Sequence, residues 1–193
     1  NIPQLKCTRM YLGGVVGTNS REMGSGNANL ADGDITVSGL NVNSDYLYVG
    51  GVVGLNSAAV SNASNAGDVV LTSGSTCKKS MFVGGVVGRG EGNISSCTNS
   101  GAVSNACPAT TSGSYLQVGG IVGYNNGSSA VSNCHNTGNV INTANCNGYL
   151  YVGGITSEAD AAVSNCDNTG DVTNSGNSAQ SKWISVGGVV GLI

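Results

Sequence analysis

The sequence predicts an all-β protein, a parallel β-solenoid (β-helix) of about five coils of roughly 34 residues each. First, a glycine pair inside a β-branched run recurs with a nearly constant period, as is typical of solenoids. Second, an Asn/Ser-rich piece and a G-x-V piece follow each of the pairs from Gly50 to Gly153. Third, the abundant Gly, Asn, Ser and Thr are poor helix formers, and no 3.6-residue period appears. The glycine pairs begin at Gly13, Gly50, Gly84, Gly119, Gly153 and Gly187, which are 37, 34, 35, 34 and 34 residues apart.

We divide the chain into repeats at approximately residues 11–45, 46–80, 81–114, 115–148 and 149–180, with a partial repeat at 181–193. They make up a single domain, 1–193, which we expect to be a segment of a longer chain because both ends fall inside the pattern. The glycine-pair run, a V-S-N-C piece and the G-x-V piece predict three short strands per coil. By analogy with other parallel β-helices, we expect right-handed coils.

The glycine-pair run predicts a strand that bends. Leu47 and Val49 share one face of a strand, because side chains two residues apart point the same way. The next position that is β-branched in every repeat is that of Val52, three residues after Val49 instead of two. A corner or bulge at the two glycines absorbs this slip of the alternation. The alternative is a straight strand with glycine where another backbone approaches closely. In either case one buried column is expected to contain Val49, Val83, Val118 and Val152.

The other two pieces predict further columns. Val60, Ile94, Val131 and Val163 stack in one column, and Val69, Val103, Val140 and Val172 stack in another. Between them lies an Asn-x-Gly step, such as Asn65 and Gly67, which predicts a turn because both residues tolerate positive φ. The recurring asparagines can hydrogen-bond along the axis as a ladder.

Composition argues against several functional classes. The seven Lys and Arg residues are scattered, which predicts no nucleic-acid partner, and no apolar run is long enough for membrane insertion. The single histidine, His135, excludes an H-E-x-x-H metal site. We therefore expect no catalytic residue, metal or cofactor, and a protein that is not an enzyme. Glu158 and Asp160 are the one carboxylate pair that a polysaccharide-active enzyme could use, a less favoured alternative.

The repeated pieces resemble the GLUG motif of extracellular proteins. The resemblance is carried by "YLYVGGVVGLNSAAVSNASNAGDV", "YLQVGGIVGYNNGSSAVSNCHNTGNV" and "YLYVGGITSEADAAVSNCDNTGDV" and covers nearly the whole chain. It implies an extracellular or cell-surface location and an adhesin-like building block without conserved chemistry. We therefore expect a rod-like stalk or a subunit of an extracellular filament. Its partners would be flanking domains or further copies, joined end to end.

Seven cysteines fall into two phases of the repeat. Cys97, Cys134 and Cys166 follow the S-N or S-S step, and Cys7, Cys77, Cys107 and Cys146 precede the next glycine-pair strand. We predict intra-coil disulfides joining Cys97 to Cys107 and Cys134 to Cys146. One alternative is bridging between cysteines of the same phase on adjacent coils, whose spacing a disulfide tolerates. Another is that several are reduced, buried small hydrophobes.

Two further sets of residues are candidates for surface chemistry. Sequons for N-glycosylation occur at Asn62, Asn93 and Asn126. Aromatic residues occupy two phases, one with Tyr46, Tyr115 and Tyr149 and the other with Tyr48, Phe82 and Tyr151. We take Tyr48, Phe82 and Tyr151 as an exposed row that could bind surface glycans or a partner chain, the alternative being that the tyrosines lie over the coil edge.

Overall fold

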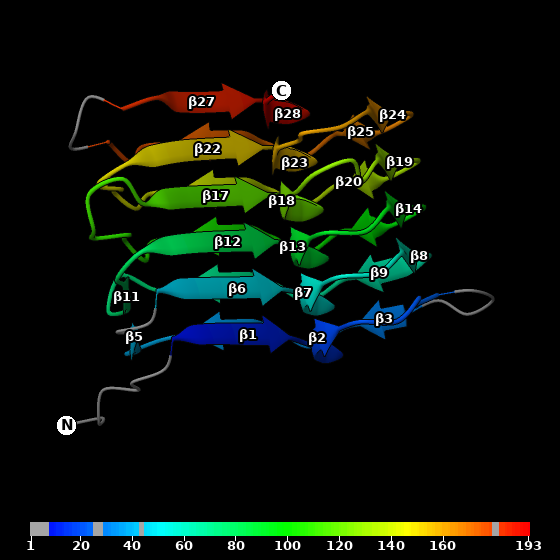
Figure 1. The fold of residues 1–193 in the computed structure, drawn as a ribbon, viewed down its shortest axis with the longest axis horizontal. Helices are drawn as coiled ribbons and strands as arrows, with labels where there is room; N and C mark the ends of the chain where they lie inside the picture. Colours follow the sequence, from blue (N-terminus) through cyan, green and yellow to red (C-terminus); the bar gives the residue numbers. More distant parts are fainter. Residues whose placement is uncertain (1–7, 25–28, 43–44, 179–181) are drawn as a thin grey trace.

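A computed structural model describes residues 8–24, 29–42, 45–178 and 182–193, so Cys7 lies outside the described residues. Short strands and no helix occur in these ranges, and every strand pairs in parallel with the equivalent strand of an adjacent coil. Figure 1 shows the coils stacked along one axis, with equivalent strands directly above one another. The predicted all-β parallel solenoid is therefore confirmed. Within the described ranges, none of the elements is a helix long and apolar enough to cross a membrane.

Two six-stranded sheets meet at the glycine pairs. The first sheet contains β1 (Arg9–Gly13), β6 (Tyr46–Gly50), β12 (Ser80–Gly84), β17 (Tyr115–Gly119), β22 (Tyr149–Gly153) and β27 (Ile184–Gly187). The second contains β2 (Val16–Asn19), β7 (Val53–Asn56), β13 (Val87–Gly90), β18 (Val122–Asn125), β23 (Thr156–Glu158) and β28 (Val190–Leu192).

Four smaller sheets complete the solenoid. The third sheet contains β8 (Val60–Ser61), β14 (Ile94–Ser95), β19 (Val131–Ser132) and β24 (Val163–Ser164). The fourth contains β3 (Asn29–Ala31), β9 (Ala63–Asn65), β15 (Thr98–Asn99), β20 (His135–Asn136) and β25 (Asp167–Asn168). The fifth contains β4 (Ile35–Val37), β10 (Val69–Leu71), β16 (Val103–Asn105), β21 (Val140–Asn142) and β26 (Val172–Asn174). A two-stranded sheet joins β5 (Asn41–Val42) to β11 (Thr76–Cys77).

The predicted three strands per coil are corrected to five in the regular coils. The glycine-pair run is divided at its corner into a strand of the first sheet and one of the second. The V-S-N-C piece is divided as well, because Asn62, Ser96, Asn133 and Asn165 adopt the left-handed conformation with φ between 50° and 53°. A left-handed residue turns the chain sharply, so the strands on its two sides belong to different sheets.

The predicted valine column is present. Val49 pairs in register with Val83, Val83 with Val118, and Val118 with Val152. All four side chains are fully buried in one core cluster. The 34-residue period therefore does place equivalent residues directly above one another.

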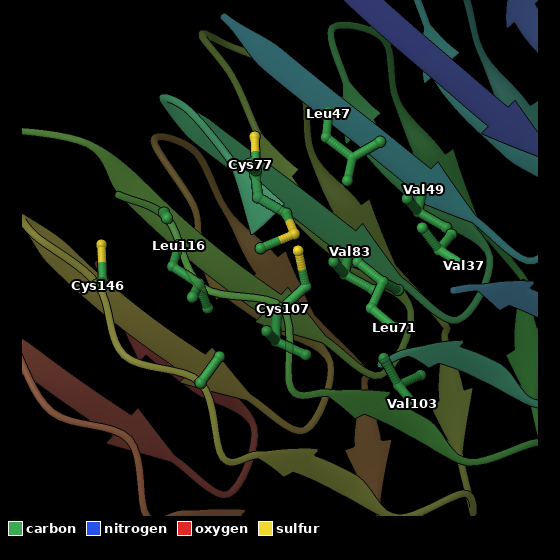
Figure 2. Packing of buried hydrophobic residues seen from close by; sticks show 14 of the residues in the cluster. Val37, Leu47, Val49, Leu71, Cys77, Val83, Val103, Cys107, Leu116 and Cys146 are labelled. Carbon is green, nitrogen blue, oxygen red and sulfur yellow. The ribbon is translucent and has the colours of Figure 1, made fainter. Parts of the chain in front are cut away.

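The interior contains two core clusters rather than one. The first lies between the inward residues of the first and fifth sheets, and Figure 2 shows Val83 and Leu71 within it, together with Cys77 and Cys107. The second lies between the second sheet and the third and fourth sheets, and includes Val52, Val86, Ile94 and Cys97. The residue after Val52 is also inward: Val53, Val87, Val122 and even Thr156 are fully buried. Two consecutive inward residues are possible because the chain turns its corner there.

The glycine pairs form the narrow waist between these two cores. A Cβ atom built on Gly51 would lie 2.1 Å from the carbonyl oxygen of Gly85 and 2.4 Å from Cγ of Asn65. The third glycine of the motif, such as Gly88, would place a Cβ 2.7 Å from the backbone nitrogen of Val49. The predicted corner is present and the alternative of a straight strand is wrong, since the run is divided between two sheets; the close backbone approach that the alternative assumed does occur at the corner.

The predicted asparagine ladder runs through this waist. Nδ2 of Asn65 donates to Oδ1 of Asn99 at 2.8 Å, Asn99 donates to Asn136 at 2.8 Å, and Asn136 donates to Asn168 at 2.7 Å. Each of these amides also donates to the carbonyl oxygen two residues ahead. The step after Asn65 is a bend, but positive φ occurs at Asn62 instead of at Asn65 or Gly67, which corrects the predicted reason for the turn.

Two further ladders were not predicted. Asn105 donates to Asn142 at 2.9 Å and Asn142 donates to Asn174 at 2.8 Å. In the second sheet Asn19 donates to Asn56 at 2.8 Å. That ladder is interrupted by Gly90, which pairs in register with Asn56 on one side and Asn125 on the other.

Gly90→Asn is expected to complete the second-sheet ladder. Oδ1 of Asn125 is buried and has no hydrogen-bond partner among the described residues. A Cβ at position 90 would lie 2.6 Å from Oδ1 of Asn125 and 2.8 Å from Cδ1 of Ile94, so the ends of these two side chains must shift in any variant. Once they have shifted, an amide at position 90 would donate to Asn125, and this should make the free energy of unfolding about 1 kcal/mol higher than that of Gly90→Ala. Chemical denaturation measures the change. Gly90→Ala serves as the control, since it changes the backbone propensity without supplying a donor. If the Ala variant were as stable as the Asn variant, the ladder would not be the cause.

Candidate functional site

The outward side chains of the first two sheets meet in a concave angle on the outside of the corner. Phe82 of β12 stacks on Tyr124 of β18, with ring centroids 5.6 Å apart. The Arg89 guanidinium, on β13, donates to the hydroxyl of Tyr48 at 3.4 Å. Because the second sheet turns back over the outer face of the first, this outer face is largely covered.

This angle corrects the predicted exposed row. Tyr48, Phe82 and Tyr151 do lie in one column, but they are only 2%, 5% and 2% exposed. Ring centroids are 5.1 Å apart between Tyr11 and Tyr48 and 5.4 Å apart between Tyr48 and Phe82, so these three rings form a continuous stack. Burial raises the pKa of Tyr48, and that of Tyr151 to about 12. The row is therefore mainly a second, external packing layer.

Arg89 closes this layer at the centre. Its guanidinium carbon lies 6.0 Å from the ring centroids of Tyr48 and Phe82 and 5.7 Å from that of Tyr124. It also forms an ion pair with Glu91 at 3.1 Å. A cation over three ring faces gains cation–π attraction in a partly desolvated place.

A groove of about 440 Å³ opens beside this layer, where the aromatic pattern is broken in two successive coils. Ser80 stands in register with Tyr46, in the column that continues to Tyr115, and Gln117 stands in register with Phe82 and Tyr151. The groove is lined by Tyr46, Tyr115, Phe82 and Tyr124, by Gln117, Glu158 and Lys79, and by Ser80 and the 111–114 segment. Sequence reasoning missed it, although "SMFVGG" and "YLQVGG" depart from "YLYVGG" at these positions.

The polar residues at the floor of the groove are only partly paired. Nε2 of Gln117 donates to the carboxylate of Glu158, whereas Oε1 of Gln117 is buried with no partner among the described residues. Burial raises the pKa of Glu158, and the hydrogen bond from Gln117 opposes that shift. Lys79 forms an ion pair with Asp45 at 3.1 Å. The groove therefore holds an ion-paired ammonium, a carboxylate bonded to an amide, and an amide oxygen without a partner, between aromatic walls.

The structure does not bring together the partners of the two predicted intra-coil disulfides. Cys97 and Cys134 lie in the second core cluster, whereas Cys107 and Cys146 lie in the first. All six described cysteines are free, and Cys7 is outside the described residues. Burial raises the pKa of Cys77 and of Cys107 to about 12, so these thiols stay protonated at neutral pH.

The cysteines of one of the two phases do lie together on adjacent coils, whereas in the other phase Ala109, and not Cys107, stands in register between Cys77 and Cys146. Cys97, Cys134 and Cys166 form one column, in which the backbone N–H of Cys134 donates to Sγ of Cys166 at 3.4 Å. A hydrogen bond with Cys97, together with burial, raises the pKa of Cys134. As free thiols, these cysteines pack as small apolar side chains, which agrees with the alternative that several cysteines are reduced and buried.

The three sequons lie at the surface. Asn62 is exposed, and its Nδ2 donates to the carbonyl of Gly24 at 3.0 Å. Asn93 is exposed and accepts from the backbone N–H of Ala130 at 2.9 Å. Asn126 is half-buried and accepts from the hydroxyl of Tyr124 at 2.9 Å. Their glycosylation stays a prediction.

Asp160, His135 and Asp167 make structural contacts. Asp160 accepts from the hydroxyl of Tyr124 at 3.0 Å and from the backbone of Gly127 at 3.1 Å. His135 and Asp167, which are neighbours in register on adjacent coils, approach to 2.5 Å at the surface. Among the described residues there is no group of three His, Cys, Asp or Glu side chains that could hold a metal ion.

Comparison with known proteins gives one match. Residues 114–141 match the family described as the GLUG motif. The matched segment begins just before β17 and ends within β21, so it covers the glycine-pair strands, the V-S-N-C piece and the start of the G-x-V piece. The same columns continue through the coils on both sides of it. No curated protein and no solved structure matches the chain.

Proposed function

The chain belongs to the GLUG-motif repeat proteins, and from this premise we propose that it is a non-enzymatic structural module of a secreted or cell-surface protein. It acts as a rod-like stalk or as a subunit of an extracellular filament. One observation carries the proposal: the regular coils place equivalent valines, glycines and asparagines in register with one another. Repetition of this kind builds length, since each coil is stabilised by its neighbours.

The last described coil supports extension along the axis. Ile184 and Val186 continue the columns of Leu150 and Val152, yet they are 44% and 47% exposed. Val189, at 37%, continues the second core in the same way. A further coil placed on β27 and β28 would bury these side chains and pair the strand edges, which otherwise invite association.

Sedimentation velocity over a wide range of protein concentrations tests the filament form of the proposal. We expect association that grows with concentration, because one copy covers the exposed end of the next. The double substitution of Val186→Lys and Val189→Lys should abolish it by placing charges on that end, whereas Lys substitution of Ser64, on the side of the rod, should not. A chain that stays monomeric at all concentrations would contradict the filament form of the proposal, and the stalk form would remain.

Incubation with neutral and acidic polysaccharides tests the non-enzymatic part. We expect no release of reducing ends. Release that is lost in Glu158→Gln or Asp160→Asn would contradict the proposal, because Glu158 lines the groove, Asp160 accepts from the groove residue Tyr124, and two such carboxylates could act as acid and base. The exposed Asn62 and Asn93 support a glycosylating, extracellular route, and peptide mapping of the protein from its natural source checks it.

A further inference from the structure

The outer column of aromatic residues on the first sheet has one ring missing. Tyr46, Tyr115 and Tyr149 present rings in this column, and between Tyr46 and Tyr115 the equivalent residue is Ser80. Ser80 is held against the next coil, since its Oγ accepts from the backbone N–H of Tyr115 at 3.1 Å. The strands therefore pair without a break at this position, while the column of aromatic rings is interrupted at Ser80.

The two rings beside the interruption face the groove with one side and are supported on the other. Tyr115 stacks on Tyr149, with centroids 4.8 Å apart and planes within 16°. The Arg9 guanidinium carbon lies 5.8 Å from the ring centroid of Tyr46, from the preceding coil. Both tyrosines line the groove. Their orientation is thus set before any ligand arrives, which lowers the entropic cost of binding.

The spacing of the coils defines what fits between them. Equivalent residues two coils apart are separated by roughly 9.6 Å, twice the strand spacing. A ring inserted midway would lie about 4.8 Å from each tyrosine, the separation that Tyr115 and Tyr149 already show. A saturated six-membered ring, thicker than an aromatic one because axial hydrogens project from its faces, fills this space better.

The polar residues that line the groove favour a polyhydroxylated ring as the ligand. Gln117 is 1% exposed, lines the groove, and carries the buried, unpartnered Oε1 described above. Glu158 and the exposed Ser112 add acceptors and a hydroxyl donor around it. Burying these groups against a purely apolar ligand would leave them unpaired. The one ammonium, on Lys79, is already paired with Asp45, so an acidic sugar would meet the Glu158 carboxylate without compensation.

We propose that the groove between Tyr46 and Tyr115 binds one neutral pyranose ring of a glycan. The ring stacks its C–H faces on the two tyrosines, and its hydroxyls bond to Gln117, Glu158 and Ser112. This inference does not depend on whether the rod forms filaments, because the groove lies on the side of the rod, on residues of coils two to five, and contains none of the exposed end residues Ile184, Val186 and Val189.

Saturation-transfer NMR on the folded protein tests the proposal, with the methyl pyranosides of glucose, galactose, mannose and N-acetylglucosamine as probes. We expect transfer to at least one of them. Ser80→Tyr should abolish it, because the new side chain restores the missing ring and fills the groove. The variant should still fold, since tyrosine occupies the same register position in the adjacent coils.

Tyr115 variants separate stacking from hydrogen bonding. Tyr115→Leu should weaken the bound pyranoside by about tenfold, whereas Tyr115→Phe, which keeps the ring, should bind nearly as well as the wild type. Tyr11→Leu removes an aromatic residue of the other column, in the first coil, and should leave binding unchanged. Circular dichroism confirms that each variant is folded.

Two results would overturn the inference. One is the absence of transfer to all of these pyranosides from the folded wild-type protein. The other is binding that Ser80→Tyr retains, which would place the sugar elsewhere on the rod. Neither result bears on the filament, because association is measured on the wild type and on the Val186 and Val189 variant without any sugar.

Discussion

Gly120→Ala is expected to unfold the central coils or to lower the free energy of unfolding by at least about 4 kcal/mol. Gly120 is the second glycine of its pair, at the waist between the two cores. A Cβ atom there would lie 2.0 Å from the carbonyl oxygen of Gly154 and 2.4 Å from Nδ2 of Asn136. The first of these is backbone of the next coil, so it cannot move aside without separating the coils.

The separation would propagate through every interaction that depends on coil spacing. Gly120 N–H donates to the carbonyl of Gly153 at 3.1 Å, and the inward valines on both sides of the corner pack against the same neighbouring coil. Solenoid stability is a sum of nearest-neighbour interfaces, so opening one interface removes a full term of that sum. A loss of this size is a large part of the total stability of a typical domain.

Gly188→Ala is the matched control for this prediction. Gly188 has the same place in the motif, but no atom of the described residues lies within 4 Å of a Cβ built on it. We expect its melting temperature to stay within a few degrees of the wild type, while that of Gly120→Ala collapses. Equal melting temperatures for the two variants would show that close approach between coils is not what requires the glycine.

Asn136→Ala is expected to lower the free energy of unfolding by about 3 kcal/mol, less than only Gly120→Ala among these substitutions. Asn136 is a fully buried, interior rung of the waist ladder. It accepts from Asn99 at 2.8 Å, donates to Asn168 at 2.7 Å and donates to the carbonyl of Gly138 at 2.7 Å. Alanine removes all three bonds and leaves buried donors and acceptors that water cannot reach, which costs more than the bonds themselves are worth.

Asn168→Ala tests whether position in the ladder decides the cost. Asn168 is a half-buried rung nearer the exposed end, and its loss leaves Asn136 with its bond to Gly138. We expect Asn168→Ala to lower the free energy of unfolding, measured by chemical denaturation, by about 1 kcal/mol. If Asn136→Ala were no worse than Asn168→Ala, the ladder would be a by-product of stacking and not a source of stability.

The candidate site was only partly predictable. The aromatic residues of the outer columns could be found because they recur at the period of the repeat. Their burial could not, since it arises where the outer faces of two sheets meet across the corner. The groove depends on two departures from the repeat, Ser80 and Gln117, which are single residues without a pattern of their own. Cys97 and Cys107 are close in sequence, yet the waist places them in different cores.

By itself, the sequence determined which residues lie above one another. A constant period with equivalent residue types predicts the parallel stacking, the column of Val49 and its equivalents, and the ladder of Asn65 and its equivalents, because neighbours along the axis are related by the period alone. Only the tertiary structure decided the path within one coil: five strands, two cores, the left-handed residue at Asn62, and the concave angle that covers Tyr48. The physical reason is that the period specifies contacts between coils, whereas the angles between successive strands follow from backbone conformation at one or two residues and from how closely the chains can approach there.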